Sequence, residues 1–135
     1  MASYVKFNSF VEAVAEKVHN LGSDTLKVAL TNSAPSASNT VLANITEISY
    51  TNLSDRTLTV SSSAQSSGTY KLVIADLTLT ASGAVGPFRY IVIYNDTATN
   101  DELIAYFDYG SNVTLASGDQ FILDFDGTNG LLQIV

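Results

Sequence analysis

Residues 7–30 read Phe7-Asn8-Ser9-Phe10-Val11-Glu12-Ala13-Val14-Ala15-Glu16-Lys17-Val18-His19-Asn20-Leu21-Gly22-Ser23-Asp24-Thr25-Leu26-Lys27-Val28-Ala29-Leu30, and the spacing of their apolar residues changes partway. As far as Leu21 the apolar residues recur at intervals of three and four, which is the period of one helix face. From Leu26 they alternate with polar or small residues, which is the period of a half-buried strand. The change predicts one short amphipathic helix followed by strands.

The predicted helix covers residues 7–21 and carries a signal at each end. Ser9 followed by Glu12 fits a capping box at its start, and Gly22 suits the left-handed residue that often follows a helix. With the residues before it, the helix forms an N-terminal arm and helix over residues 1–22. A chain of 135 residues fits one domain, which we expect to cover residues 1–135.

The strand period continues from the helix to the C-terminus. Residues 88–94 are apolar on both parities except for Arg89, which is typical of a central strand covered on both faces. Leu58 and Val60 mark a short strand that runs into residues 61–68, which are rich in Ser and predict a flexible loop. Near Ala75-Asp76 the apolar parity changes, which favours a β-bulge over a break between two strands. Residues 41–50 fit either a helical turn or an irregular strand or loop, and we favour the latter.

The remaining segments complete a mainly β fold. Further strands are expected at residues 102–109, 113–115, 121–125 and 131–135, separated by turn-forming residues at 110–112, 117–119 and 126–130. This regular spacing predicts an antiparallel β-sandwich with one N-terminal amphipathic α-helix.

The composition bears on the classes of partner. A net charge of -7 has the wrong sign for neutralising phosphates or anionic lipids, so we expect neither nucleic acid nor a membrane as partner. No segment approaches the ~20 apolar residues that span a bilayer, and the N-terminus lacks the apolar run of a secretory signal. The chain has no cysteine, hence no thiolate chemistry.

Two features suggest catalysis or metal binding and have simpler structural interpretations. His19 is the only histidine, and nothing in the spacing supplies a nucleophile or carboxylate beside it. The segment Asp124-Phe125-Asp126-Gly127-Thr128-Asn129-Gly130 superficially resembles a calcium loop, but the bidentate Glu that should follow is missing. A polar hairpin turn explains it better, although a weak cation site of another kind stays open. We expect no cofactor and no enzymatic activity.

Acidic and aromatic residues offer a further alternative, a carbohydrate site. Acidic residues that could supply a glycosidase-like pair are Asp76, Asp96, Asp101, Glu102, Asp108 and Asp119. Most lie beside turn formers, where solvated carboxylates discourage edge pairing. Tyrosines that could stack on sugar rings are Tyr90, Tyr94, Tyr106 and Tyr109, although sheets also use aromatic residues in cores and interfaces.

Two stretches resemble small virion structural proteins of tailed bacteriophages. One is the quoted run from Phe7 to Leu30, continuing through Thr31-Asn32. The other is Gly86-Pro87-Phe88-Arg89-Tyr90-Ile91-Val92-Ile93-Tyr94-Asn95-Asp96-Thr97-Ala98-Thr99, together with the Asp-Gly-Thr-Asn-Gly turn at residues 126–130. Residues 50–67 depart from the pattern of the family, because a compact linker stands where a longer Gly-rich insert is usual.

The resemblance covers nearly the whole chain and implies a capsid decoration (cement) protein in the virion, made in the host bacterial cytoplasm. Its partners would be the major capsid protein or other virion proteins, and we expect a homo-oligomer. The alternative is a tail-tip or fibre-associated module that binds host surface polysaccharide. A cell-wall hydrolase is disfavoured. We place the contacts in residues 2–7 or on the helix stripe. The expected interface residues are Tyr4, Phe7, Phe10, Val14, Tyr106 and Tyr109.

Overall fold

The structure is a computed structural model and describes residues 2–135. Its largest sheet has the strand order β1-β7-β6-β2, with every neighbouring pair antiparallel. The strands of this sheet are β1 (Ser3–Lys6), β2 (Leu26–Thr31), β6 (Val85–Asn95) and β7 (Leu103–Leu115). The described chain is therefore mainly β with antiparallel sheets, as the sequence predicts.

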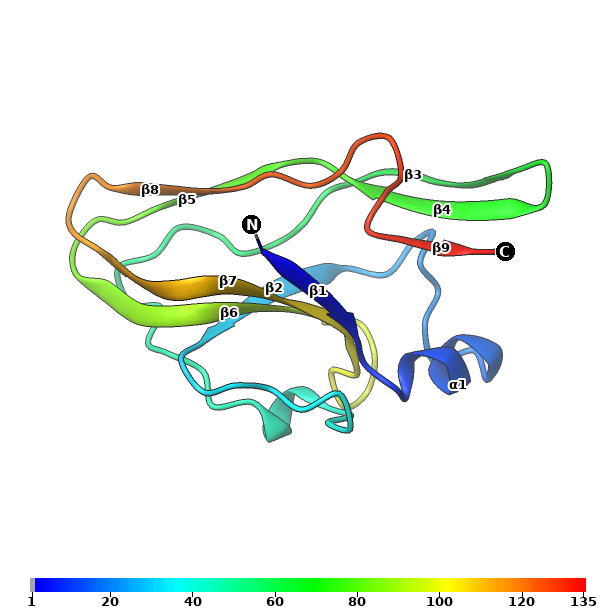
Figure 1. Ribbon diagram of the computed structural model, residues 1–135, viewed down its shortest axis with the longest axis horizontal. Coiled ribbons are helices and arrows are strands. Elements are labelled where there is room, and N and C mark those ends of the chain that lie inside the picture. Colours follow the sequence, from blue (N-terminus) through cyan, green and yellow to red (C-terminus); the bar gives the residue numbers. More distant parts are fainter. Residues whose placement is uncertain (1) are drawn as a thin grey trace.

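Two smaller antiparallel sheets face this one. One contains β3 (Val60–Ser66), β4 (Thr69–Ile74) and β9 (Leu132–Ile134), and the other contains β5 (Leu77–Thr80) and β8 (Gln120–Leu123). Figure 1 shows β3, β4, β5, β8 and β9 along one side of the molecule and the four-stranded sheet along the other. Buried side chains of both layers, such as Leu30, Ile93, Leu72 and Leu79, pack into one core.

The outer face of the four-stranded sheet is also covered. Val92, Tyr94 and Phe7 are buried there in a second cluster, against which Leu42 and Ile45 of the segment between β2 and β3 pack. Strand β6 is thus buried on both of its faces, which confirms the prediction from residues 88–94. The covering segment contains a 3-10 turn, η1 (Leu42–Asn44), and residues 45–50 contain neither helix nor strand. The helical-turn alternative for residues 41–50 is therefore correct only at its start, and the favoured irregular loop is correct for the rest.

The helix is shorter than predicted. Helix α1 covers Phe10–Ala15 only, and Ser9 makes no side-chain capping hydrogen bond. Lys17 adopts a left-handed backbone conformation (φ 66°), the Val18 N–H donates to the Ala13 carbonyl, and the Lys17 N–H donates to the Val14 carbonyl. This pair of bonds is a Schellman motif, which ends a helix. The prediction that Gly22 ends the helix is wrong, because Lys17 takes the left-handed position five residues earlier.

The Ser-rich segment is a strand and not a flexible loop. Residues 60–66 form β3, which pairs with β4 through a two-residue turn at Ser67 and Gly68. Both turn residues have positive φ (50° and 84°), as the type I′ hairpin turn requires. Most of β3 is exposed, so its polar side chains need no apolar periodicity while its backbone still pairs. This is why the pattern of side chains gave no strand signal.

Two other boundaries differ from the prediction. The change of parity at Ala75-Asp76 is a break between β4 and β5 and not a bulge. At this break the Asp76 carboxylate accepts a hydrogen bond from the Phe125 N–H. The predicted turn at residues 110–112 lies inside β7. Gly110 (φ 96°) is in the part of β7 where the pairing with β6 shifts register, so the chain bends there without leaving the sheet.

Candidate docking groove

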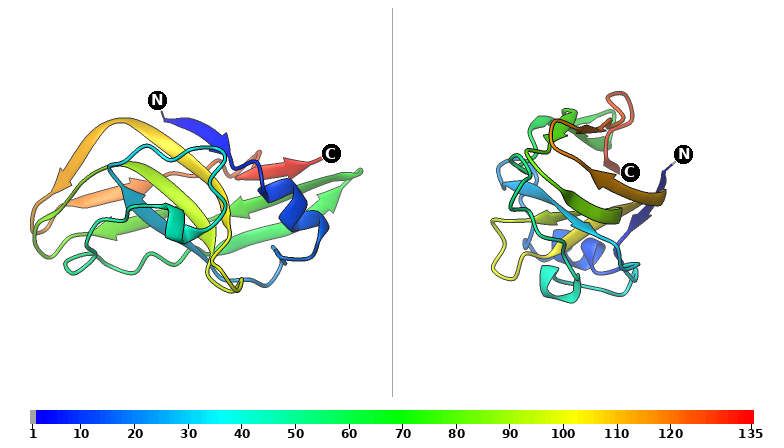
Figure 2. Two further views of the ribbon diagram at one scale, coloured as in Figure 1. Left: turned by 90° about the horizontal axis from the view of Figure 1, so that it is seen from below. Right: turned by 90° about the vertical axis from the view of Figure 1, so that its left-hand side faces the viewer.

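The described chain has an open groove between the two layers. It has a volume of about 840 Å³ and lies between β1 and β7 on one side and β8 with the following loop on the other. Both views of Figure 2 place β1 and the loop between β8 and β9 at the same side of the molecule. We call this hollow the aromatic groove. Its aromatic side chains are those of Tyr4, Phe107, Tyr109, Phe121 and Phe125.

Edge-to-face contacts fix these rings. The ring centroids of Tyr4 and Phe107 are 5.3 Å apart with an interplanar angle of 62°, and those of Tyr109 and Phe121 are 5.2 Å apart at 69°. Such pairs gain about 1 kcal/mol beyond their buried area, which holds the rings in place before any partner arrives. Tyr4 and Tyr109 remain 40% and 44% exposed, and Ile122 is 60% exposed. The groove therefore offers rigid apolar surface to a partner.

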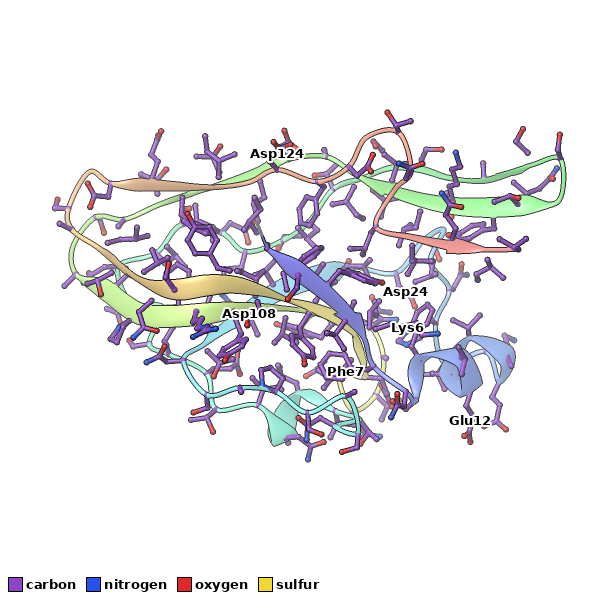
Figure 3. The ribbon with its side chains drawn as sticks, viewed as in Figure 1. Lys6, Phe7, Glu12, Asp24, Asp108 and Asp124 are labelled. Carbon is purple, nitrogen blue, oxygen red and sulfur yellow. The ribbon has the colours of Figure 1, made fainter. Side chains whose placement is uncertain are left out.

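The charges at the groove are acidic. Asp124 and Asp126 line it, and within the described part of the chain no Lys, Arg or His does. Asp126 accepts hydrogen bonds from the N–H groups of Thr128 and Asn129 and from the Asn129 side chain, and these bonds lower the pKa of its carboxyl group. Asp124 is exposed and lies on the layer opposite Asp108 (Figure 3). The groove thus disfavours anions and suits a neutral or cationic partner.

The structure divides the expected interface residues between two faces. Tyr4 and Tyr109 line the aromatic groove. Tyr106 lies on the outer face of the same sheet and contacts the buried ring of Phe7, with centroids 5.3 Å apart. Phe10 is buried in the core.

Val14 of α1 is partly buried and packs against the core. The exposed apolar residues around the helix are instead Val11 and Val18. The helix stripe is therefore used mainly inside the domain, and of the expected contact residues Tyr4 and Tyr109 offer the most surface.

The side chain of His19 is packed and hydrogen-bonded within the fold. Its ring stacks on Phe10 with centroids 5.4 Å apart, and the Asn95 side-chain NH₂ group lies 2.9 Å from His19 Nδ1. The same NH₂ group donates to Asp24 Oδ2 at 2.7 Å. Burial lowers the pKa of His19, with the charges of Glu102 and Asp24 acting in the opposite direction. The arrangement ties the chain after α1 to the end of β6.

Three of the acidic residues considered for catalysis make contacts of their own, whereas burial and the nearby charges of Asp96 and Glu102 raise the pKa of the Asp101 carboxyl group. Asp108 forms a bidentate ion pair with Arg89, at 2.8 and 3.2 Å, which lowers the pKa of its carboxyl group. Asp119 accepts from the Ala116 N–H, and Asp96 lies 3.4 Å from the Lys27 ammonium. Within residues 2–135 no group of three or more acidic or histidine side chains is placed to hold a metal ion.

The candidate tyrosines do not share one surface. Tyr94 is buried, Tyr90 and Tyr106 contact each other with centroids 6.4 Å apart, and Tyr109 lies in the aromatic groove. A sugar-stacking surface built from all of these residues is therefore excluded. Any stacking at the groove would use Tyr4 and Tyr109.

Sequence reasoning missed the contribution of β8 to the groove. Phe121 and Ile122 are adjacent apolar residues of opposite parity, and this pattern could have indicated a strand with apolar side chains on both faces. The role of Asn95 had no signal in the sequence, because its partners His19 and Asp24 lie more than 70 residues away.

Comparison of the chain with protein-family models found no match, and comparisons with curated proteins and with solved structures likewise found none. Among residues 2–135, no helix is both long and apolar enough to cross a membrane.

Proposed function

We propose that this chain is a non-enzymatic structural protein of a bacteriophage virion, and specifically a decoration protein that stabilises the head through lattice contacts. The fold that we propose is a β-sandwich. Its two layers enclose one core, and the short N-terminal helix closes one end. The partner is the major capsid protein or another virion protein.

The observation that supports this function is the aromatic groove. A rigid, exposed apolar surface without a basic residue suits docking onto another protein. A specific interface needs only about 800 Å² on each partner. A lattice repeats the contact many times, so modest affinity per copy suffices.

The test is the location of the protein and its dependence on the groove. Imaging of purified particles should place the protein on the head, and heads that lack it should bind it when it is added back. Ile122→Asp should lower the bound amount about ten-fold or more, because it would bury an unpaired carboxylate in the contact.

Val11→Asp is the matched control. Val11 is 55% exposed on α1 and does not line the groove, so this variant should bind as the wild-type protein does. Normal binding of Ile122→Asp, or a position in the tail, would contradict the proposal. Val14→Asp is less informative, since Val14 packs against the core and its substitution tests folding as well as docking.

A second candidate function is recognition of host surface polysaccharide by a tail-tip or fibre-associated module. The specific observation in its favour is that two partly exposed tyrosines, Tyr4 and Tyr109, line the same groove as an exposed carboxylate, Asp124. No basic side chain of residues 2–135 lines that groove. Glycan-array binding that disappears in Tyr109→Ala and survives in Tyr106→Ala would favour this function. Absence of glycan binding together with binding to heads would favour decoration.

A further inference from the structure

Strand β1 has an open edge. The Phe7 N–H donates to the Ile104 carbonyl at 3.1 Å, so alternation along the antiparallel ladder turns the backbone groups of Val5 and Ser3 toward β7. The N–H and C=O groups of Tyr4 and Lys6 therefore point away from the sheet. Within residues 2–135, no strand pairs with this side of β1.

The opposite edge of the same sheet is covered. Along β2, the Val28 N–H donates to the Arg56 carbonyl at 3.0 Å, and the Leu26 carbonyl accepts from the Leu58 N–H at 2.9 Å. The Leu30 carbonyl accepts from the Ile48 N–H at 3.0 Å. The segment between β2 and β3 thus forms hydrogen bonds with the backbone groups along the β2 edge of the sheet, whereas no described segment does so along the outer edge of β1. An uncovered edge pairs readily with another strand.

We propose that the open edge of β1 pairs with β1 of a second copy of the chain. In an antiparallel arrangement with a two-fold axis at Val5, Tyr4 lies opposite Lys6 of the second copy, and Lys6 lies opposite Tyr4 of the second copy. The outward N–H and C=O groups of both residues are then hydrogen-bonded, and the same surface serves on each copy. The two four-stranded sheets become one continuous sheet.

Charge complementarity supports a second copy as the occupant. Residues directly opposite in an antiparallel pair lie on the same face, so Lys6 of the second copy lies beside the ring of Tyr4 at the rim of the aromatic groove. Among residues 2–135 the groove carries Asp124 and Asp126 and no basic side chain, so Lys6 of the second copy brings a cation to acidic surroundings. An ammonium group over a tyrosine ring adds a favourable contact.

The overall charge opposes this association. Each copy carries a net charge of -7, so two copies repel each other at long range. Salt screens this repulsion, with a Debye length of about 8 Å at physiological ionic strength. Dimerisation should therefore strengthen as salt concentration rises.

The experiment measures the oligomeric state of the purified full chain by analytical ultracentrifugation over a wide range of protein concentrations. The wild-type protein should dimerise. Lys6→Pro removes an N–H that faces away from β7 and should raise the dissociation constant at least about ten-fold. Lys6→Ala keeps that N–H and loses the ammonium group together with the carbon chain that carries it, so it should raise the constant about three-fold. Tyr109→Ala leaves the edge intact and should dimerise normally.

Hydrogen exchange of the wild-type protein tests the same edge without any variant. Protection of the Tyr4 and Lys6 amides should rise with protein concentration, while the Val5 amide should stay protected throughout. A monomer at every concentration would overturn the proposal, and so would a dimer whose Tyr4 and Lys6 amides exchange freely. If added glycan or heads protect those amides in a monomer, the edge has another occupant. None of the dimer measurements requires a virion, so this proposal and the decoration function can fail independently.

Discussion

At the scale of single residues, hydrogen bonds fix the orientation of the Asn95 side chain. Its Oδ1 accepts from the N–H groups of Thr97 (3.0 Å) and Ala98 (3.2 Å), so its NH₂ group must face His19 and Asp24. His19 Nδ1 is then an acceptor, which assigns the ring proton of the neutral form to Nε2. A second proton on Nδ1 would meet the Asn95 NH₂ group, so folding favours neutral His19.

Stability should therefore depend on pH through His19. Its pKa in the folded chain lies below the ordinary value of 6.5, so the unfolded chain binds more protons once the pH drops below that value. The free energy of unfolding should fall as the pH decreases from about 6.5. The contribution of His19 to this fall should end only once His19 is protonated in the folded chain as well. Urea denaturation at pH 7.5 and pH 5.5 measures the difference.

His19→Gln is the control for this prediction, because it keeps an acceptor for Asn95 and does not titrate. Its stability should change less than that of the wild-type protein between the two pH values. Asp108 and Asp126 have lowered pKa values and lose their contribution only below their ordinary value of 3.8, outside this window. Parallel pH profiles for the two proteins would refute the assignment.

At the scale of elements, α1 ends at a residue that is poorly suited to its conformation. Lys17 has φ 66°, a conformation that costs a residue with a Cβ about 1 kcal/mol and costs glycine little. Lys17→Gly should therefore stabilise the protein, by about 0.5 to 1 kcal/mol in urea denaturation. A matched Glu16→Gly change places glycine at a position with φ -97° and should destabilise instead. Destabilisation by both would contradict this account of the helix end.

The approach of the last turn to β4 predicts a difference between two glycines. A Cβ on Gly130 would lie 2.5 Å from the Leu72 carbonyl oxygen, which also accepts the Leu131 N–H, whereas a Cβ on Gly110 would meet nothing within 4 Å. Both glycines have positive φ. Gly110→Ala should cost about 1 kcal/mol from its backbone conformation alone. Gly130→Ala should cost at least about 2 kcal/mol more, measured by denaturation, and equal losses would show that the close approach is absent.

The sequence predicted best those elements whose side chains are buried against a neighbouring layer of the fold. Strand β6 is apolar on both parities because both of its faces are buried, and this relation is local to the strand. Strand β3 could not be found in this way, because its stability comes from backbone pairing with β4 and its side chains are mostly exposed.

The predicted length of the helix was wrong for a different reason. Its stripe continues past Ala15, but Leu21 and His19 reach buried positions through a turn and not through further helix. The aromatic groove was beyond prediction, since it depends on which edges of the two layers meet.

At the scale of the whole molecule, the four-stranded sheet acts as a middle layer between the smaller sheets and the segment that joins β2 to β3. Leu103 and Ile104 are neighbours on β7, both fully buried, and they belong to clusters on opposite faces of that sheet. If packing on both faces of the sheet stabilises the fold, Leu103→Ala and Ile104→Ala should each lower the free energy of unfolding by about 3 kcal/mol. Ile122→Ala, at a 60% exposed position in the aromatic groove, should lower it by less than about 0.5 kcal/mol. A small loss for Leu103→Ala beside a large one for Ile104→Ala would mean that the covering segment contributes little, and that the outer face could itself be free to receive a partner.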